Sequence, residues 1–175
     1  LGKTKGVPKV HEARPSRKAV GEKDALVSEI IQKTNFTKGY GLVLGISDKW
    51  LGLVQNSSAQ LVGSGKPAAI DALRGKLDKH GFTADRVSLF VGNGIDLDFP
   101  RYFASLIVIE ENSELIWSKR SLAQVYSSLR PYGGSLCVPG SEKYRDAFRT
   151  AVKTSKLPGA SLSEGKGFTL LKKDG

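Results

Sequence analysis

The sequence is poor in residues that build covalent or metal-bound frameworks: its 175 residues include one cysteine, two histidines and no methionine. A single cysteine excludes an internal disulfide, and Cys137 lies in the apolar run SLCV, where we expect a buried, unreactive thiol. His11 and His80 have no cysteine or histidine partners at metal-ligand spacing. No apolar run approaches the roughly 20 residues of a membrane-spanning helix. These absences argue against a disulfide-stapled, zinc-binding or membrane-spanning domain.

The chain begins at Leu1 and lacks methionine, so we expect it to be part of a longer protein. A targeting signal would then lie outside it, and the localisation of this soluble domain stays open. A length of 175 residues suits one domain whose core needs no cross-link. The hydrophobic fraction of 39% is ordinary for a globular protein.

Half of the net positive charge lies in a short N-terminal segment. The whole chain has a net charge of +10, and residues 1–23, with seven Lys or Arg and two Glu, contribute +5. Because residues 1–22 contain Pro and Gly but no apolar periodicity, we interpret them as a solvated tail or linker before a domain over 23–175. The rest is modestly basic and shows no RNA-binding aromatic signature, so nucleic-acid binding is disfavoured and rests on net charge alone.

We expect this tail to contribute nothing to the stability of the fold. Removal of residues 1–20 should leave the melting temperature nearly unchanged, because the segment has no apolar stripe that packs against a core. Thermal unfolding followed by circular dichroism checks this. A drop of several degrees in the truncated chain would show instead that the tail packs on the domain.

Short apolar runs alternate with amphipathic segments through the rest of the chain. GLVLG at 41–45 is a continuous apolar run bounded by glycines, which is typical of a strand buried on both faces. Residues 67–80 predict the clearest helix, because Pro67 suits a first turn and Gly81 suits the end. Further strands are expected at 59–63, 86–92, 104–110, 135–138, 160–164 and 168–173, and further helices at 23–33, 48–55, 122–129 and after Ser141. The alternation predicts an α/β domain with a parallel sheet and a terminal hairpin.

Three segments carry a resemblance to a known family. LRPYGGSLCV (129–138) is similar to an L-x-P-G-G turn before a fifth strand, RVSLFVGNGIDLDFP (86–100) to a third strand with its loop, and VLGISDKWLG (43–52) to a glycine-rich first motif. In order and spacing, these segments and the elements over 23–173 resemble the class I S-adenosylmethionine-dependent methyltransferase superfamily. The resemblance implies a three-layer Rossmann-like fold with a mostly parallel seven-stranded sheet, order 3-2-1-4-5-7-6, and a C-terminal antiparallel hairpin.

The resemblance also implies where S-adenosylmethionine, the family's cofactor, would bind. Gly45 matches the first glycine of the motif that approaches the methionine part of the cofactor. Ser47 and Lys49 stand where further glycines are expected, and Lys49 adds bulk and positive charge beside a sulfonium. Asp48 is available to cap the helix that follows.

Three more positions follow from the resemblance, each after a predicted strand. Ser64 stands where an acidic residue would bind both ribose hydroxyls, and Lys66 adds positive charge nearby. Asn93 matches a residue that contacts the adenine amino group, although the triplet Gly92-Asn93-Gly94 equally suits a turn. Glu110 stands near the transferred methyl group, where a carboxylate acts as a base or holds an amine, unless it is an exposed strand end. No catalytic residue is assigned.

Two of the three cofactor motifs are altered, so we favour a degenerate methyltransferase-like domain that serves as a binding or scaffolding module. Two lysines beside a helix N-terminus would attract an anion in place of the cofactor. The first alternative is an active methyltransferase for a small substrate, and the second is a basic nucleic-acid-binding domain. The ending GKGFTLLKKDG (165–175) resembles the junction before a quinoprotein-like β-propeller in large bacterial proteins, so the expected partner is a neighbouring domain of the same protein.

Overall fold

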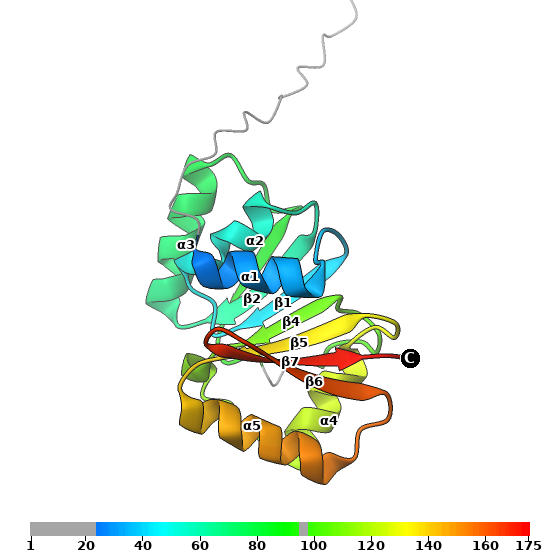
Figure 1. Cartoon of the computed structure of the whole chain (residues 1–175). Helices are drawn as coiled ribbons and strands as arrows, with labels where there is room; N and C mark the ends of the chain where they lie inside the picture. Colours follow the sequence, from blue (N-terminus) through cyan, green and yellow to red (C-terminus); the bar gives the residue numbers. More distant parts are fainter. Residues whose placement is uncertain (1–23, 95–97) are drawn as a thin grey trace, which may run out of the picture.

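The computed structural model describes residues 24–94 and 98–175, which form a sheet with helices on both faces (Figure 1). The strands are β1 (Tyr40–Leu44), β2 (Gln60–Gly65), β3 (Val87–Val91), β4 (Leu106–Ile109), β5 (Gly134–Pro139), β6 (Ala160–Gly165) and β7 (Phe168–Lys173). The helices are α1 (Ala25–Thr34), α2 (Leu51–Gln55), α3 (Pro67–Lys79), α4 (Lys119–Ser128) and α5 (Glu142–Ser155), with the 3₁₀ helices η1 (Asp48–Trp50) and η2 (Glu111–Ser113). The predicted tail over 1–22 lies outside the described residues.

Neighbouring strands follow the order β3-β2-β1-β4-β5-β7-β6. The first five run parallel, and β7 is antiparallel to both β5 and β6. Because parallel neighbours need a crossover, α2, α3 and α4 each connect two strands of the sheet. The predicted mostly parallel sheet, with GLVLG at its centre and a terminal antiparallel hairpin, is confirmed.

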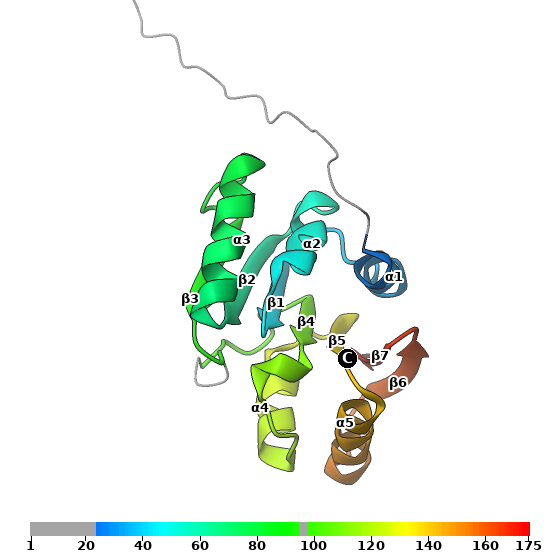
Figure 2. The same ribbon diagram turned by 90° about the vertical axis from the view of Figure 1, so that its left-hand side faces the viewer.

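Three layers are visible in Figure 2: α1, α2 and α3 cover one face of the sheet, and α4 and α5 cover the other. β1 is buried on both faces because its side chains alternate between two cores. Leu42 and Leu44 belong to the core under α4 and α5, whereas Val43 belongs to the core under α1–α3. This burial explains why the strand is continuously apolar.

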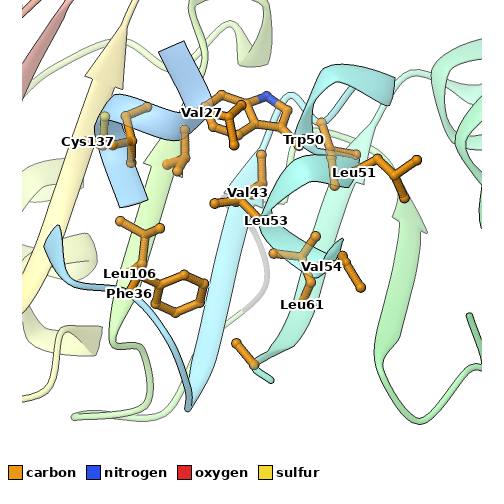
Figure 3. Close-up of a cluster of buried hydrophobic side chains, with 14 of the residues drawn as sticks. Val27, Phe36, Val43, Trp50, Leu51, Leu53, Val54, Leu61, Leu106 and Cys137 are labelled. Atoms are coloured by element: carbon orange, nitrogen blue, oxygen red, sulfur yellow. The ribbon is translucent and has the colours of Figure 1, made fainter. Parts of the chain in front are cut away.

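The core under α1–α3 is built around Trp50, whose side chain is fully buried (Figure 3). Leu53, Leu61 and Leu106 join it from α2, β2 and β4. Cys137 lies in the same core, and burial raises the pKa of its thiol well above the usual value. The expectation of a buried, inert cysteine is therefore confirmed.

The connection from β3 to β4 contains no helix within its described parts, 92–94 and 98–105. One face of the β3 edge is therefore left open, and Phe90 and Val91 are exposed. The first residues of this connection instead turn across the end of β2. None of the helices in the described part of the chain is both long and apolar enough to cross a membrane.

Candidate functional site

The parallel strands β1–β4 end at one edge of the sheet, here called the carboxyl edge, where open α/β sheets bind their ligands. Backbone hydrogen bonds tie the segments beyond these strands together. The amides of Gly45 and Ile46 donate to the carbonyl of Ser64 over 2.9 and 2.8 Å. The amide of Glu110 donates to the carbonyl of Leu44 over 3.0 Å. The carboxyl edge thus brings together residues that lie far apart in the sequence.

Gly45, the first glycine of the predicted cofactor motif, has the left-handed backbone that the motif needs, with φ of 79°. Its open side is occupied by the protein itself. A Cβ added to Gly45 would lie 2.1 Å from Asn112 Oδ1 and 2.9 Å from the amide nitrogen of Ser113. The loop after β4 therefore fills the space that a ligand would need to approach this glycine.

Ser64, at the position expected for the ribose-binding acid, is covered by the loop after β3. The residue is only 1% exposed, and a Cβ added to Gly94 would lie 2.1 Å from Ser64 Oγ and 2.7 Å from Leu44 Cδ2. The Ser64 hydroxyl is buried without a hydrogen-bond partner in the described part of the structure. Its route to a ribose is blocked by backbone that packs directly on it.

The space beside this contact is small. A cavity of about 10 Å³ lies between β1, α4 and the loop after β3, lined by Leu42, Leu44, Gly94 and Val125 among others. A volume of roughly 10–15 Å³ holds a single water molecule. A nucleoside does not fit without movement of the loop that carries Gly94.

Glu110 is buried at the end of β4 and is bound by two side chains from η1. The indole Nε1–H of Trp50 donates to Oε1 over 2.7 Å, and Lys49 Nζ lies 2.5 Å from the same oxygen. Lys49 Nζ also lies 5.2 Å from the centre of the Trp50 ring, within range of a cation–π contact. The interpretation of Glu110 as an exposed strand end is wrong, because its charge is neutralised inside the protein.

The lysines expected to attract an anion already face carboxylates of the chain. Lys49 pairs with Glu110, and Lys66 Nζ lies 3.3 Å from Glu114 Oε1 on the surface. The protein therefore supplies its own anions at this edge, and α2 is too short to present a strong helix terminus.

Ser47 and Asp48 lie where the chain enters η1. Ser47 precedes η1, and its side chain makes no capping hydrogen bond. Asp48 is the first residue of η1 and forms an ion pair with Lys76 of α3. The hydrogen bond from Lys76 is the main cause that lowers the pKa of Asp48. Asp48 thus joins α3 to η1, and the prediction that it caps the helix is wrong.

Asn93 lies in a tight turn on the surface. Both flanking glycines have positive φ, 132° for Gly92 and 73° for Gly94, so the turn interpretation of this triplet is supported. Asn93 is exposed, whereas Gly94 is buried against Ser64. Of the aspartates in the same stretch of sequence, Asp98 is exposed, and Asp96 lies outside the described residues.

Glu111 has a role that the sequence did not indicate. Its carboxylate accepts hydrogen bonds from the amide of Ser141 over 2.9 Å and from the Ser141 hydroxyl over 2.8 Å. Ser141 caps α5, so a carboxylate from the loop after β4 sits at the start of that helix. The amide and hydroxyl of Ser141 lower the pKa of Glu111. A signal was present in the Glu110-Glu111-Asn112 run, but only the fold shows its partner.

This interaction predicts a dependence of stability on pH. Because the pKa of Glu111 is lowered in the folded state, its contribution is present at neutral pH and is lost as pH falls below the usual pKa of a glutamate and through the lowered one. The fall in melting temperature between about pH 6 and pH 3 should be smaller in Glu111→Gln than in the wild type. Glu114→Gln, which removes only an exposed ion pair, should retain the wild-type dependence. Identical curves for all three proteins would contradict this role.

A group of aromatic side chains lies between the loop after β4 and α5. Trp117 packs on Phe148 with ring centroids 4.7 Å apart and on Tyr144 at 6.1 Å. Trp117 Nε1 and Tyr144 Oη are buried without partners in the described part of the chain. Burial raises the pKa of Tyr144 to about 12, so its hydroxyl stays protonated at neutral pH. In the described residues, no group of three His, Cys, Asp or Glu side chains could hold a metal ion.

No family model matches the chain, and no curated protein sequence matches it. Several solved structures do resemble it in fold. An S-adenosyl-L-methionine-dependent methyltransferase from Methanococcus maripaludis superposes with a TM-score of 0.69 at 14% identity, over 85% of this chain and 83% of that one. An S-adenosylmethionine-dependent O-methyltransferase from Thermotoga maritima gives 0.69 at 8% identity, over 91% and 68%. A SAM-dependent methyltransferase from Aquifex aeolicus superposes with a TM-score of 0.62 at 11% identity, over 83% of this chain and 88% of that one.

These likenesses extend over most of the described chain and include both the strand order and the terminal hairpin. At identities this low they establish architecture and not activity. The chain has the Rossmann-like fold of the class I S-adenosylmethionine-dependent methyltransferases.

Proposed function

We propose that this domain is a methyltransferase-fold binding or scaffolding module whose cofactor cleft is closed by its own side chains. The observation that carries the proposal is the packing of Gly94 on Ser64. Ser64 lies where a ribose-binding carboxylate is expected, and it is 1% exposed beneath that glycine. A serine cannot make the charge-assisted pair of hydrogen bonds that a carboxylate offers to two hydroxyls.

The other two parts of the cleft support the same proposal. Asn112 fills the open side of Gly45, where the methionine part of the cofactor would lie. Lys49 occupies the expected glycine position and brings a cation toward a ligand that itself carries a sulfonium. The residues present therefore do not fit S-adenosylmethionine, and no methyl-transfer step is assigned to them.

A binding module needs a partner. The proposal places that partner in a neighbouring domain of the same polypeptide or in a separate protein. Methyltransferase activity on a small substrate is the competing candidate, and the observation that favours it is the position of Glu110 at the end of β4. There a carboxylate would face a methyl acceptor if Lys49 and Trp50 released it.

Isothermal titration calorimetry with S-adenosylmethionine and S-adenosylhomocysteine separates the two candidates. We expect no heat of binding for the wild type at ligand concentrations up to about 1 mM. The contacts that close the cleft at Gly45, Lys49 and Ser64 would have to be broken first, at a cost of roughly 1–3 kcal/mol each. The variant Lys49→Gly, which removes the charge but leaves Ser64 covered, should also fail to bind. Micromolar binding by the wild type would overturn the closed-cleft proposal and favour the enzyme.

A further inference from the structure

The opposite edge of the sheet, where β1, β4 and β5 begin, carries exposed tyrosines beside arginines. The residues are Tyr40, Arg101, Tyr102, Arg130 and Tyr132, here called the amino-edge patch; all five are exposed. The C-terminus lies at this edge, because β7 ends beside the start of β5 with Lys173 opposite Gly134 (Figure 1). The patch is therefore separate from the closed cleft at the carboxyl edge.

Contacts between the loops join these residues into one surface. The amide of Arg130 donates to the carbonyl of Ala104 over 2.9 Å, which holds the loop before β5 against the loop before β4. The ring of Tyr40 stacks on Phe103 with centroids 4.5 Å apart. Tyr132 packs against Gly175, where an added Cβ would lie 3.0 Å from the ring. The three tyrosines thus lie at or before the beginnings of three adjacent strands, β1, β4 and β5.

A buried lysine supports the middle of the patch. Lys173 donates to the carbonyls of Tyr126 and Leu129, each over 3.1 Å, and its Nζ lies 5.0 Å from the centre of the Tyr102 ring. The pKa of Lys173 is lowered by burial first and by the positive charge of Arg101 second. A cation under the ring fixes Tyr102 on the surface.

Two of the three tyrosines are held in a backbone conformation that bulky residues avoid. Tyr102 has φ of 60° and Tyr132 has φ of 58°, and both are in the left-handed region. Their side chains are 58% and 81% exposed, so packing of the rings does not explain the strain. Strained, exposed residues of this kind cluster at binding sites.

The arginines of the patch carry unneutralised charge. In the described residues, neither Arg101 nor Arg130 forms an ion pair, whereas Arg74, Arg145 and Arg149 do. Asp174, which follows β7, accepts a hydrogen bond from the Ser161 hydroxyl over 3.1 Å. Unpaired guanidinium groups beside exposed rings match a ligand that combines negative charge with flat aromatic groups.

We propose that the amino-edge patch binds single-stranded nucleic acid, with unpaired bases stacked on Tyr102 and Tyr132 and phosphates paired with Arg101 and Arg130. Single strands suit the patch better than a duplex, because only unpaired bases offer a free face to a protruding ring. The sequence shows no compact basic-aromatic motif, because Arg101-Tyr102 and Arg130-Pro131-Tyr132 lie almost thirty positions apart. The fold brings them to one edge.

Fluorescence anisotropy of a labelled 12-nucleotide oligo-dT, titrated with the full chain in about 50 mM salt, tests the proposal. The variant Tyr102→Asn/Tyr132→Asn should bind about a hundredfold more weakly, since stacking on one aromatic ring contributes about tenfold or more. Asparagine tolerates the left-handed backbone, so folding is retained. The matched control Tyr102→Phe/Tyr132→Phe keeps both rings and should bind like the wild type.

The arginines have a separate readout. In Arg101→Gln/Arg130→Gln, the slope of log affinity against log salt should become shallower by about 0.7 for each phosphate that is no longer neutralised. Lys143→Gln/Lys153→Gln removes the same charge from α5 and should leave the slope unchanged. Any of three results overturns the proposal. The first is no binding of the oligonucleotide at a protein concentration of about 100 µM, which is on the order of the dissociation constant of the weakest non-specific complexes. The other two are binding of polyphosphate or of duplex DNA with the same affinity as oligo-dT, and wild-type affinity in the asparagine variant. The basic residues 1–23 are present in every protein, so they cannot produce the differences.

Discussion

The variant Ser64→Asp is expected to lose most of the stability of the domain, whereas Ser64→Ala is expected to fold like the wild type. A carboxylate at position 64 would be buried beneath Gly94 and against Leu44, at a place where the present hydroxyl finds no hydrogen-bond partner in the described part of the structure. An uncompensated buried charge costs about 3–5 kcal/mol. In a domain of this size, that corresponds to a fall in melting temperature of about 6–20 °C.

The alanine variant is the matched control for this result. It removes only a hydroxyl that is buried without a partner in the described part of the structure, so the change in free energy of unfolding should be close to zero. Differential scanning calorimetry measures both variants. If Ser64→Asp melted with the wild type and gained affinity for S-adenosylmethionine, position 64 would be open to ligand and the closed-cleft proposal would fail. The acidic residue that a cofactor site requires is, in this packing, a destabilising one.

The second large effect is expected at Glu110. Truncation in Glu110→Ala leaves the indole N–H of Trp50 and the ammonium of Lys49 without their shared acceptor. Removal of one partner of a buried pair costs about 3–5 kcal/mol, and because the Lys49 side chain is 33% exposed we expect about 3 kcal/mol. Urea unfolding at pH 7 should show a lower midpoint with an unchanged slope.

Glu110→Gln separates the hydrogen bond from the charge. The amide oxygen still accepts from Trp50 but no longer neutralises Lys49, so a loss of about 1–2 kcal/mol is expected. If Glu110→Ala changed the free energy of unfolding by less than about 0.5 kcal/mol, it would behave like a substitution at an ordinary surface position. It would show that the carboxylate is not engaged and is available for chemistry.

The fold could be predicted from the sequence because local patterns and long-range packing agree. GLVLG is apolar at every non-glycine position because β1 is buried on both faces, and Ser141 stands before a helix whose amide it caps. Pro67 and Gly81 mark the two ends of α3 for the same local reasons. Each signal depends on residues within one element or directly beside it, so it can be recognised from the sequence alone.

The candidate site was predictable only in its position along the chain. Gly45, Ser64 and Glu110 lie at the carboxyl edge, as the order of the strands implies. What each residue touches depends on the loops after β3 and β4, and no motif or periodicity in the sequence identifies the partners of these loops. The contacts of Gly94 with Ser64 and of Asn112 with Gly45 join positions 30 and 67 residues apart. No pattern within a single segment encodes such a contact.

The same separation explains the misread roles of Asp48 and Glu110. A carboxylate before a helix has a strong local preference for capping, and a carboxylate after a strand is usually solvated. Here Lys76 and Trp50 supply specific partners that outweigh those preferences. The two partners come from α3 and η1, which become neighbours only when the sheet has formed.

The pairing of β1 with β4 also has a consequence for how the chain is made. Gly41 pairs with Leu106, so the ribosome must add 65 more residues after Gly41 before β1 can pair with β4, its second neighbour in the sheet. At ribosomal rates of roughly 5–20 residues per second, that wait lasts about 3–13 s. Until then one edge of β1 has unpaired amides and carbonyls, and the core around Val43 lacks Leu106. A substitution that delays this closure should lower the yield of folded chain during synthesis more than it lowers the stability of the finished domain.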